Sequence, residues 1–360
     1  MKFIQFMVLA GIVAFSNTVL AHHSDVGLDE ELVVALEGKV TNFRWRQPHV
    51  YLTLDVMENG EAVSWGIQLV SVNILARRGW SADSLVSGDE VFLRVHPATN
   101  GRKYGKLIFI ERADGTPVAI DPEVVANSNA KTDSLNGNWT AINPGSDSPP
   151  PPRPAGESAS AAAEETSPAC TSGFDCFFRT NLVLNDAAKA AVEAYDPLSA
   201  DNPEATCVGR PTPAALMSAK GYLLQLDLSE AEEKIFIRSE WFSEERTVWM
   251  DGRAHPEPSE TLATGHSIGH WEDDTLVVDT QNFDNHRSPY QIGVPSGSQK
   301  HVVERYLLSA DGRSMEVEYT LEDPEFLAEP LTHRNKLYFA PHMKMLSSSC
   351  DIENTRRFLN

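Results

Sequence analysis

Histidines at the predicted mature amino terminus could bind a metal ion. His22 and His23 directly follow Val19-Leu20-Ala21, which places small residues where a signal peptidase needs them. Cleavage after Ala21 would give His22 a free α-amine beside its imidazole, and these two nitrogens can chelate one ion. A third nitrogen would complete a T-shaped set, which suits the square-planar preference of Cu(II).

The third copper ligand that we expect is His49. It follows Pro48 in a turn and begins a strand of the same small domain, while His23 is a local competitor. The α-amine and the imidazole of His22 must both be deprotonated to bind the ion. Their ordinary pKa values are about 8 for the amine and about 6.5 for imidazole. Binding should therefore weaken below about pH 6. The alternative is a frayed terminus and a His49 that only caps a turn.

A second group of polar residues lies in the downstream half. A histidine beside a carboxylate is the usual equipment for general acid–base catalysis, and inward-facing members of this group would supply it. His301 and Arg305 share one face of an alternating strand, so we expect them to pair. The alternative is a set of structural ion pairs and turns. The candidate catalytic residues are His301, His266, His255, Asp279 and Arg305.

Residues 265–269 match the G-x-S-x-G pattern of a hydrolase nucleophile elbow, and Asp279 and His301 follow in the required order. The elbow needs a buried strand before the serine and a helix after it. Here residues 258–264 are polar and broken, and a strand follows. The context argues against a serine hydrolase.

The chain begins with a predicted secretory signal at residues 1–21. Lys2 precedes an apolar run too short to span a bilayer, and no later segment is long enough. We expect a periplasmic or secreted protein with no membrane span. The formal charge is −21, and loss of Lys2 makes it −22, which repels nucleic acid. The expected partner is a small molecule or metal ion; any protein partner is unknown.

Four cysteines in an exported chain predict two disulfides rather than a metal site. Three connectivities are open. We favour Cys170 with Cys176 and Cys207 with Cys350, because the other pairings would straddle a flexible stretch.

That stretch divides the chain into two domains. Residues 143–168 are rich in Pro, Ser, Ala and Glu, a composition that cannot bury enough surface to fold, so we assign residues 121–168 to a linker. Upstream, residues 22–120 alternate as three strands, a short helix and two strands, which is the order of an OB-like barrel. Another five-stranded barrel would give the same pattern. The predicted elements are strands 32–45, 49–56, 62–70, 90–96 and 104–111 and helix 72–78.

Residues 169–360 predict an antiparallel β-sheet or barrel with a few helices. Asn185 can cap a helix at 186–195, and most of the remainder alternates as strands. Asp251-Gly252 and Asp311-Gly312 are hairpin turn signals, and strands 301–308 and 314–321 flank the second of them. The predicted fold class is mostly β, with one small barrel followed by a larger β domain.

Several motifs resemble a bacterial family of exported domains of unknown function. The upstream motifs are HHS at 22–24, QPHV at 47–50, RGW at 78–80 and SGDE at 87–90, with Gln47 where members usually have Asn. The downstream half looks like a region that often accompanies that domain. Its motifs are DGRAHP at 251–256, GHSIGHWE at 265–272 and DTLVVDT at 274–280. The resemblance implies export and the two-part layout and supplies no reaction.

The sequence thus leaves three functions open. The first is an exported ligand-binding protein that binds copper through its mature amino terminus. The second is a periplasmic enzyme that uses histidine and carboxylate acid–base chemistry in the downstream domain. The third is a scaffold for protein interactions.

Overall fold

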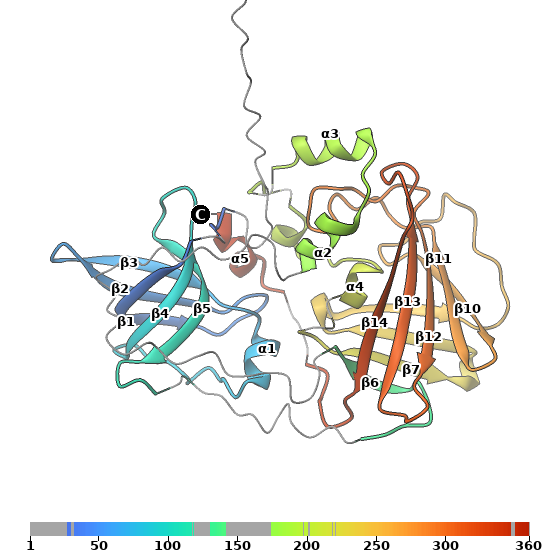
Figure 1. Cartoon of the computed structure of the whole chain (residues 1–360), viewed down its shortest axis with the longest axis horizontal. Coiled ribbons are helices and arrows are strands. Elements are labelled where there is room, and N and C mark those ends of the chain that lie inside the picture. Colours follow the sequence, from blue (N-terminus) through green and yellow to red (C-terminus); the bar gives the residue numbers. More distant parts are fainter. Residues whose placement is uncertain are drawn as a thin grey trace, which may run out of the picture.

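The computed structural model describes residues 27–29, 32–116, 118, 130–141, 174–196, 198–200, 202–217, 219, 221–346 and 350–359. Within these ranges the strands form two closed β-barrels (Figure 1). The predicted signal, His22, His23 and Cys170 lie outside the described residues, as does the low-complexity stretch 143–168. No described helix is long and apolar enough to cross a membrane.

The first barrel has the predicted OB-like topology. Its strands follow the order β1-β2-β3-β5-β4, and β5 pairs in parallel with β3. Leu52, Leu54 and Val56 point into its core from one strand, which is the alternation that predicted the strand. Ser71 caps the helix as expected by accepting a hydrogen bond from the Ile74 amide. The elements are β1 (Val34–Arg44), β2 (Tyr51–Glu58), β3 (Glu61–Gln68), α1 (Val72–Arg77), β4 (Glu90–Pro97) and β5 (Tyr104–Arg112).

The second barrel has the order β10-β11-β12-β13-β14-β6-β7-β8-β9 among the described strands. Neighbouring strands are antiparallel except β9 and β10, which close the barrel as a parallel pair. The strands are β6 (Gly137–Thr140), β7 (Leu224–Ser229), β8 (Lys234–Ser239), β9 (Glu244–Trp249), β10 (His266–Glu272), β11 (Thr275–Gln281), β12 (His301–Leu308), β13 (Ser314–Glu322) and β14 (Leu331–Phe339).

Short helices accompany the second barrel. Asn185 caps α3 as predicted, accepting a hydrogen bond from the Ala188 amide. The helices are α2 (Phe174–Asn181), α3 (Asp186–Ala194), α4 (Ala214–Met217) and α5 (Ile352–Thr355), with 3₁₀ turns at Pro203–Thr206, Glu230–Glu232, Trp241–Ser243 and Arg356–Leu359.

The structure differs from the sequence predictions at two points of this barrel. The strand β6 lies inside the range assigned to the linker, and its Trp139 is fully buried between β14 and β7. Asp251-Gly252 does not form a hairpin, because the strands on either side of it are parallel and cannot be joined by a tight turn. The favoured disulfide between Cys207 and Cys350 is present, and Cys176 is also disulfide-bonded.

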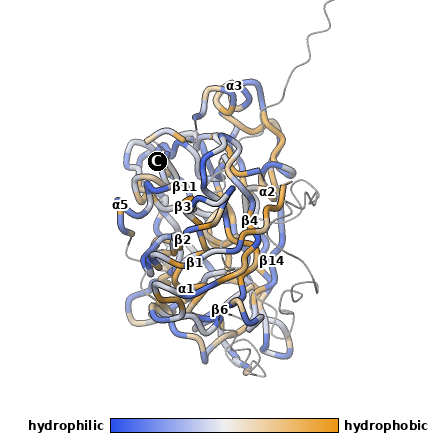
Figure 2. Tube along the Cα trace, turned by 90° about the vertical axis from the view of Figure 1, so that its left-hand side faces the viewer, coloured by the Kyte–Doolittle hydropathy of each residue, from blue (hydrophilic) through white to orange (hydrophobic). Residues whose placement is uncertain are grey.

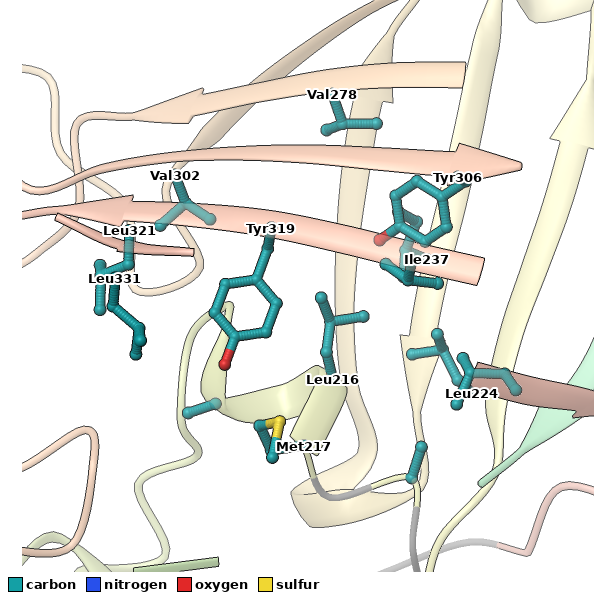
Figure 3. Packing of buried hydrophobic residues seen from close by; sticks show 14 of the residues in the cluster. Leu216, Met217, Leu224, Ile237, Val278, Val302, Tyr306, Tyr319, Leu321 and Leu331 are labelled. Atoms are coloured by element: carbon teal, nitrogen blue, oxygen red, sulfur yellow. The ribbon is translucent and has the colours of Figure 1, made fainter. Parts of the chain in front are cut away.

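Apolar side chains from opposite walls fill the second barrel. Val278, Val302 and Tyr319 point inward from neighbouring strands, and Leu216 and Met217 of α4 pack against them (Figure 3). Apolar and polar residues are interleaved along the trace, as expected for strands with one buried face (Figure 2).

A polar group is also buried inside this barrel. The guanidinium of Arg246 forms an ion pair with Glu304 and donates hydrogen bonds to Thr280 Oγ1 at 3.0 Å and Ser267 Oγ at 3.3 Å. Thr212 donates its hydroxyl hydrogen to the same Glu304 carboxylate. Burying a charge is unfavourable unless it is paired, so these contacts fix which residues of β9, β10, β11 and β12 face inward.

His286 should make the stability of the second barrel depend on pH. Its buried ring donates from Nε2 to the Gly209 carbonyl at 2.9 Å and accepts the Ser288 amide at Nδ1 at 3.1 Å, so only the neutral ring satisfies both bonds. Burial and the nearby Lys300 lower the pKa of His286 from 6.5 to about 4. The unfolded chain therefore binds the proton more readily, and stability falls as the pH decreases from 6.5 towards 4.

We expect the contribution of His286 to the free energy of unfolding to fall by up to about 3 kcal/mol across this interval. Urea titrations at several pH values measure it. His286→Gln should be less stable at neutral pH and should flatten the slope. The exposed His342 provides the control, since His342→Gln should retain it. An unchanged slope in His286→Gln would show that another group is responsible.

Candidate functional site

Three of the downstream motifs meet on the outer face of the second barrel. His266 comes from β10, Asp279 from β11 and His301 from β12, and His255 reaches them from the connection between β9 and β10. The candidate catalytic histidines thus share one location.

The alternation of the strands places these side chains outside the barrel. Ser267, Thr280 and Val302 are each 0% exposed and face the interior, so their neighbours His266, Asp279 and His301 face outward. The register then sets the lateral positions. His266 lies opposite Gln281 of β11, and His301 lies opposite Glu322 of β13.

The connection that carries His255 is fastened on both sides of that residue. Upstream, Arg253 donates to both carboxylate oxygens of Asp251 and stacks on the ring of Trp249 at 3.6 Å. Downstream, Asn282 donates from Nδ2 to the carbonyls of Pro256 and Glu257, both at 3.1 Å. His255 is therefore held between two anchored points rather than on a free loop.

Hydrogen-bond contacts join these side chains into a continuous chain. His266 Nδ1 lies 3.0 Å from His255 Nδ1, and His255 Nε2 lies 2.9 Å from Asp279 Oδ1. On the other side, His301 Nε2 lies 3.1 Å from Asp279 Oδ2, and His301 Nδ1 lies 3.3 Å from Glu322 Oε2. We call His266, His255, Asp279, His301 and Glu322 the histidine cluster.

The carboxylates determine which ring nitrogens carry protons. An ionised carboxylate only accepts, so His255 donates Nε2–H to Asp279, and in its neutral form the lone pair of Nδ1 faces His266. His301 faces carboxylates with both nitrogens, which favours the doubly protonated ring. The hydrogen bond to Asp279, opposed by partial burial, raises the pKa of His301.

The pKa shifts of His266 and Asp279 favour a neutral histidine and a charged acid. Partial burial, together with electrostatic interactions with His255 and Arg253, lowers the pKa of His266. Burial alone would raise the pKa of Asp279, but its hydrogen bonds with His301 and His255 outweigh burial and lower it. At neutral pH the cluster therefore holds an ionised Asp279 and a neutral His266.

Two expectations about this group differ from the structure. Arg305 does not pair with His301, because its guanidinium binds Glu272 at 2.6 Å on the exposed part of the sheet. The cluster also faces away from the barrel interior, where the polar group is instead that of Arg246 and Glu304. Sequence reasoning missed Glu322, although the hairpin predicted around Asp311-Gly312 already placed it opposite His301.

Ser267 is not the nucleophile of a hydrolase elbow. Its hydroxyl lies inside the barrel, 2.9 Å from Thr280 Oγ1, on the opposite face of the sheet from Asp279 and His301. It also lies within β10 rather than at a strand-to-helix turn. The surroundings of Ser267 are therefore those of a barrel strand and not of a hydrolase elbow, as its sequence context predicts.

The predicted amino-terminal copper site remains a prediction. His22 and His23 lie outside the described residues, and His49 Nδ1 lies 3.2 Å from the Leu69 carbonyl. Across the described ranges, no group of three or more His, Cys, Asp or Glu side chains is arranged to hold a metal ion. A metal at the histidine cluster would therefore use His255 and His266 together with water.

The protonation of His301 can be tested by NMR. We expect Asp279→Asn to lower the pKa of His301, because the hydrogen bond to Asp279 is the largest cause of the rise. Glu322→Gln should lower it less, because the Glu322 hydrogen bond contributes less. Titration of the ring carbon shifts measures both variants. A larger effect from Glu322→Gln would show that the carboxylates contribute in the reverse order.

Comparison with known proteins adds one assignment. No curated protein matches the chain. Residues 10–107 match the model of a family described as "Family of unknown function (DUF6152)", which extends from the predicted signal into β5. This match agrees with the resemblance expected from the upstream motifs. It shows that most of the first barrel is similar in sequence to an uncharacterised family.

Proposed function

We propose that this protein is exported and binds a divalent transition-metal ion at the histidine cluster, through His255 Nδ1 and His266 Nδ1. The observation that carries the proposal is the 3.0 Å separation of these two nitrogens, which face one another. Imidazole nitrogens lie about 2.0–2.1 Å from a bound zinc ion, so two neighbouring ligands of one ion are about 3 Å apart. On binding, the metal would displace the proton of this contact, and both rings would turn their Nδ1 lone pairs towards the ion.

The surroundings of His255 are those of a supported metal ligand. Ligating histidines usually donate their second N–H to a carboxylate, which fixes the ring and makes the binding nitrogen more basic. Asp279 provides that carboxylate at 2.9 Å, and it is itself held by His301 at 3.1 Å and by Gln281 at 3.4 Å. Asp279 therefore supports His255 directly, and His301 and Gln281 in turn hold Asp279.

The ligand set indicates the class of metal. Imidazole suits Zn(II), Cu(II) and Ni(II), whereas Mg(II) and Ca(II) prefer oxygen ligands. His255 is only 14% exposed, yet Asp279 and His301 are 32% and 27% exposed, so water can reach the cluster. Water would complete the coordination, and such an open site favours reversible binding over a structural role.

General acid–base catalysis is the second candidate function. It is favoured by the same chain of contacts, because Asp279 orients His255, His255 contacts His266, and the pKa of His266 is lowered. A neutral His266 could then accept a proton from a substrate at the surface of the barrel. This function needs no metal, so metal titration separates the two candidates.

Isothermal titration of the mature protein with Zn(II) and Cu(II) tests the metal proposal. We expect His266→Asn to weaken binding at least about tenfold, since one of the two ligands is lost. His270→Asn is the matched control. His270 lies on the same strand but is 62% exposed and contacts Glu272, so its removal should leave the affinity unchanged. Equal affinities of His266→Asn and the parent protein would refute the proposal.

A second variant tests the supporting carboxylate. Asp279→Asn keeps the size of the side chain but removes its charge, and we expect it to weaken metal binding by about 10–100-fold. Circular dichroism should first establish that the variant folds. A folded Asp279→Asn protein with the parent's affinity would show that His255 needs no carboxylate support.

The amino-terminal copper site is a separate proposal with a separate readout. It requires cleavage directly before His22, so one extra residue there should abolish that binding and leave binding at the histidine cluster intact. Mass spectrometry of protein from the periplasm would establish both export and the mature terminus. Copper affinity that is unchanged by the extra residue would exclude the amino-terminal site alone.

A further inference from the structure

The two barrels have separate apolar cores, and a buried polar contact joins them. Arg77 of α1, in the first barrel, forms an ion pair with Glu240 of the second, and their side chains are 9% and 0% exposed. The Glu240 carboxylate also accepts the amides of Leu223 at 2.9 Å and Leu346 at 2.6 Å. Removing any of these donors would leave part of a buried charge unpaired, which is costly.

The carboxyl-terminal segment takes part in this contact. We define this segment as residues 341–346 and 350–359. Besides the Leu346 amide, it provides the Lys344 carbonyl to Arg77 at 3.3 Å and the Leu346 carbonyl to Asn73 at 3.4 Å. It is also fixed to the second barrel, where Asn138 donates to the Met343 carbonyl at 2.8 Å. The docking contact is therefore shared among the first barrel, the second barrel and this segment.

The same segment holds the turn that precedes β2. Asn354 of α5 is fully buried and donates from Nδ2 to the carbonyls of His49 at 2.8 Å and Gln47 at 3.0 Å. Asp351 pairs with Arg46 at 3.0 Å. The Gln47 side chain in turn donates to Asn73 Oδ1 at 2.5 Å. The QPHV motif thus contacts both α5 and α1, at the junction of the two barrels.

One covalent bond fixes the segment beside α5. Cys350 immediately precedes Asp351 and is joined to Cys207 of the second barrel, 143 residues away in sequence. Both cysteines are partly exposed, whereas Cys176 is buried. Thiol–disulfide exchange requires access of the attacking thiolate to sulfur, and the partial exposure of Cys207 and Cys350 allows a reductant to reach their bond.

We propose that the Cys207–Cys350 disulfide controls docking of the first barrel onto the second, and that its partner is a dithiol of the thiol–disulfide oxidoreductase class. A thiolate of that dithiol attacks one sulfur and displaces the other as a thiolate. The second thiol of the reductant then attacks the reductant's own sulfur in this mixed disulfide and displaces the remaining cysteine as a thiolate, so two electrons and two protons pass to the cysteines and the reductant leaves as its own disulfide. Reduction frees α5 and loosens the shared polar contact, while each barrel keeps its own core.

Hydrogen–deuterium exchange of the full mature protein tests this device, with the Cys207→Ser/Cys350→Ser double variant compared with the parent. Amides that lie in the contact should exchange at least about tenfold faster in the variant, because the segment is no longer tethered by a covalent bond and local opening costs less free energy. The peptides that report on the contact cover residues 46–51, 72–77 and 341–346. Peptides of β12 and β13 should be unchanged, because those strands belong to the core of the second barrel.

Two further measurements keep the test decisive. The parent protein, treated with a dithiol and followed in time, should show the same local increase as the double variant, so the result does not depend on how the variant folds. The Cys170→Ser/Cys176→Ser control should leave exchange at the contact unchanged. Identical exchange in the double variant and the parent would overturn the proposal. A uniform increase across both cores would also overturn it, because the disulfide would then support the whole fold.

Discussion

The histidine cluster depends on the negative charge of Asp279. Its two oxygens accept from His255 at 2.9 Å and from His301 at 3.1 Å, so one carboxylate sets the orientation of two rings from different parts of the chain. Because His255 must donate from Nε2, its Nδ1 is directed to His266. Without the charge, neither the tautomer of His255 nor the protonation of His301 would be defined.

The position of Asp279 depends in turn on the interior of the barrel. The neighbouring Thr280 accepts a hydrogen bond from the buried Arg246 at 3.0 Å, and Arg246 is paired with Glu304. A slip of one residue in β11 would expose Thr280 and bury Asp279 without a counter-charge. The buried ion pair therefore fixes the register, and the register places Asp279 on the outer face. The Arg246–Glu304 ion pair thus determines both which residues of β11 are buried and which are exposed.

Much of this arrangement could be predicted from the sequence. Period-two alternation located the strands of the first barrel and both strands of the hairpin around Asp311-Gly312, because each strand has one buried face. Grouping His255, His266, His301 and Asp279 was also possible, since they crowd the strands and turns of one domain. The short β6 was missed because its pairing with β14 and β7 joins segments far apart in sequence. The predicted pairing of Arg305 with His301 was wrong, because the partner of Arg305 is Glu272 on another strand.

The place of His255 could not be predicted, because it follows from how the second barrel closes. The strands β9 and β10 are parallel, so residues 250–265 must return along the barrel before β10 can begin, which a tight turn would not require. This return brings the connection over the outward side chains of β10 and β11. There Asn282, which has a positive φ of 56°, fastens it through the carbonyls of Pro256 and Glu257. An antiparallel closure would need only a short turn, and His255 would then have no path to Asp279. Thus the parallel pair that completes the barrel also brings His255 to the cluster.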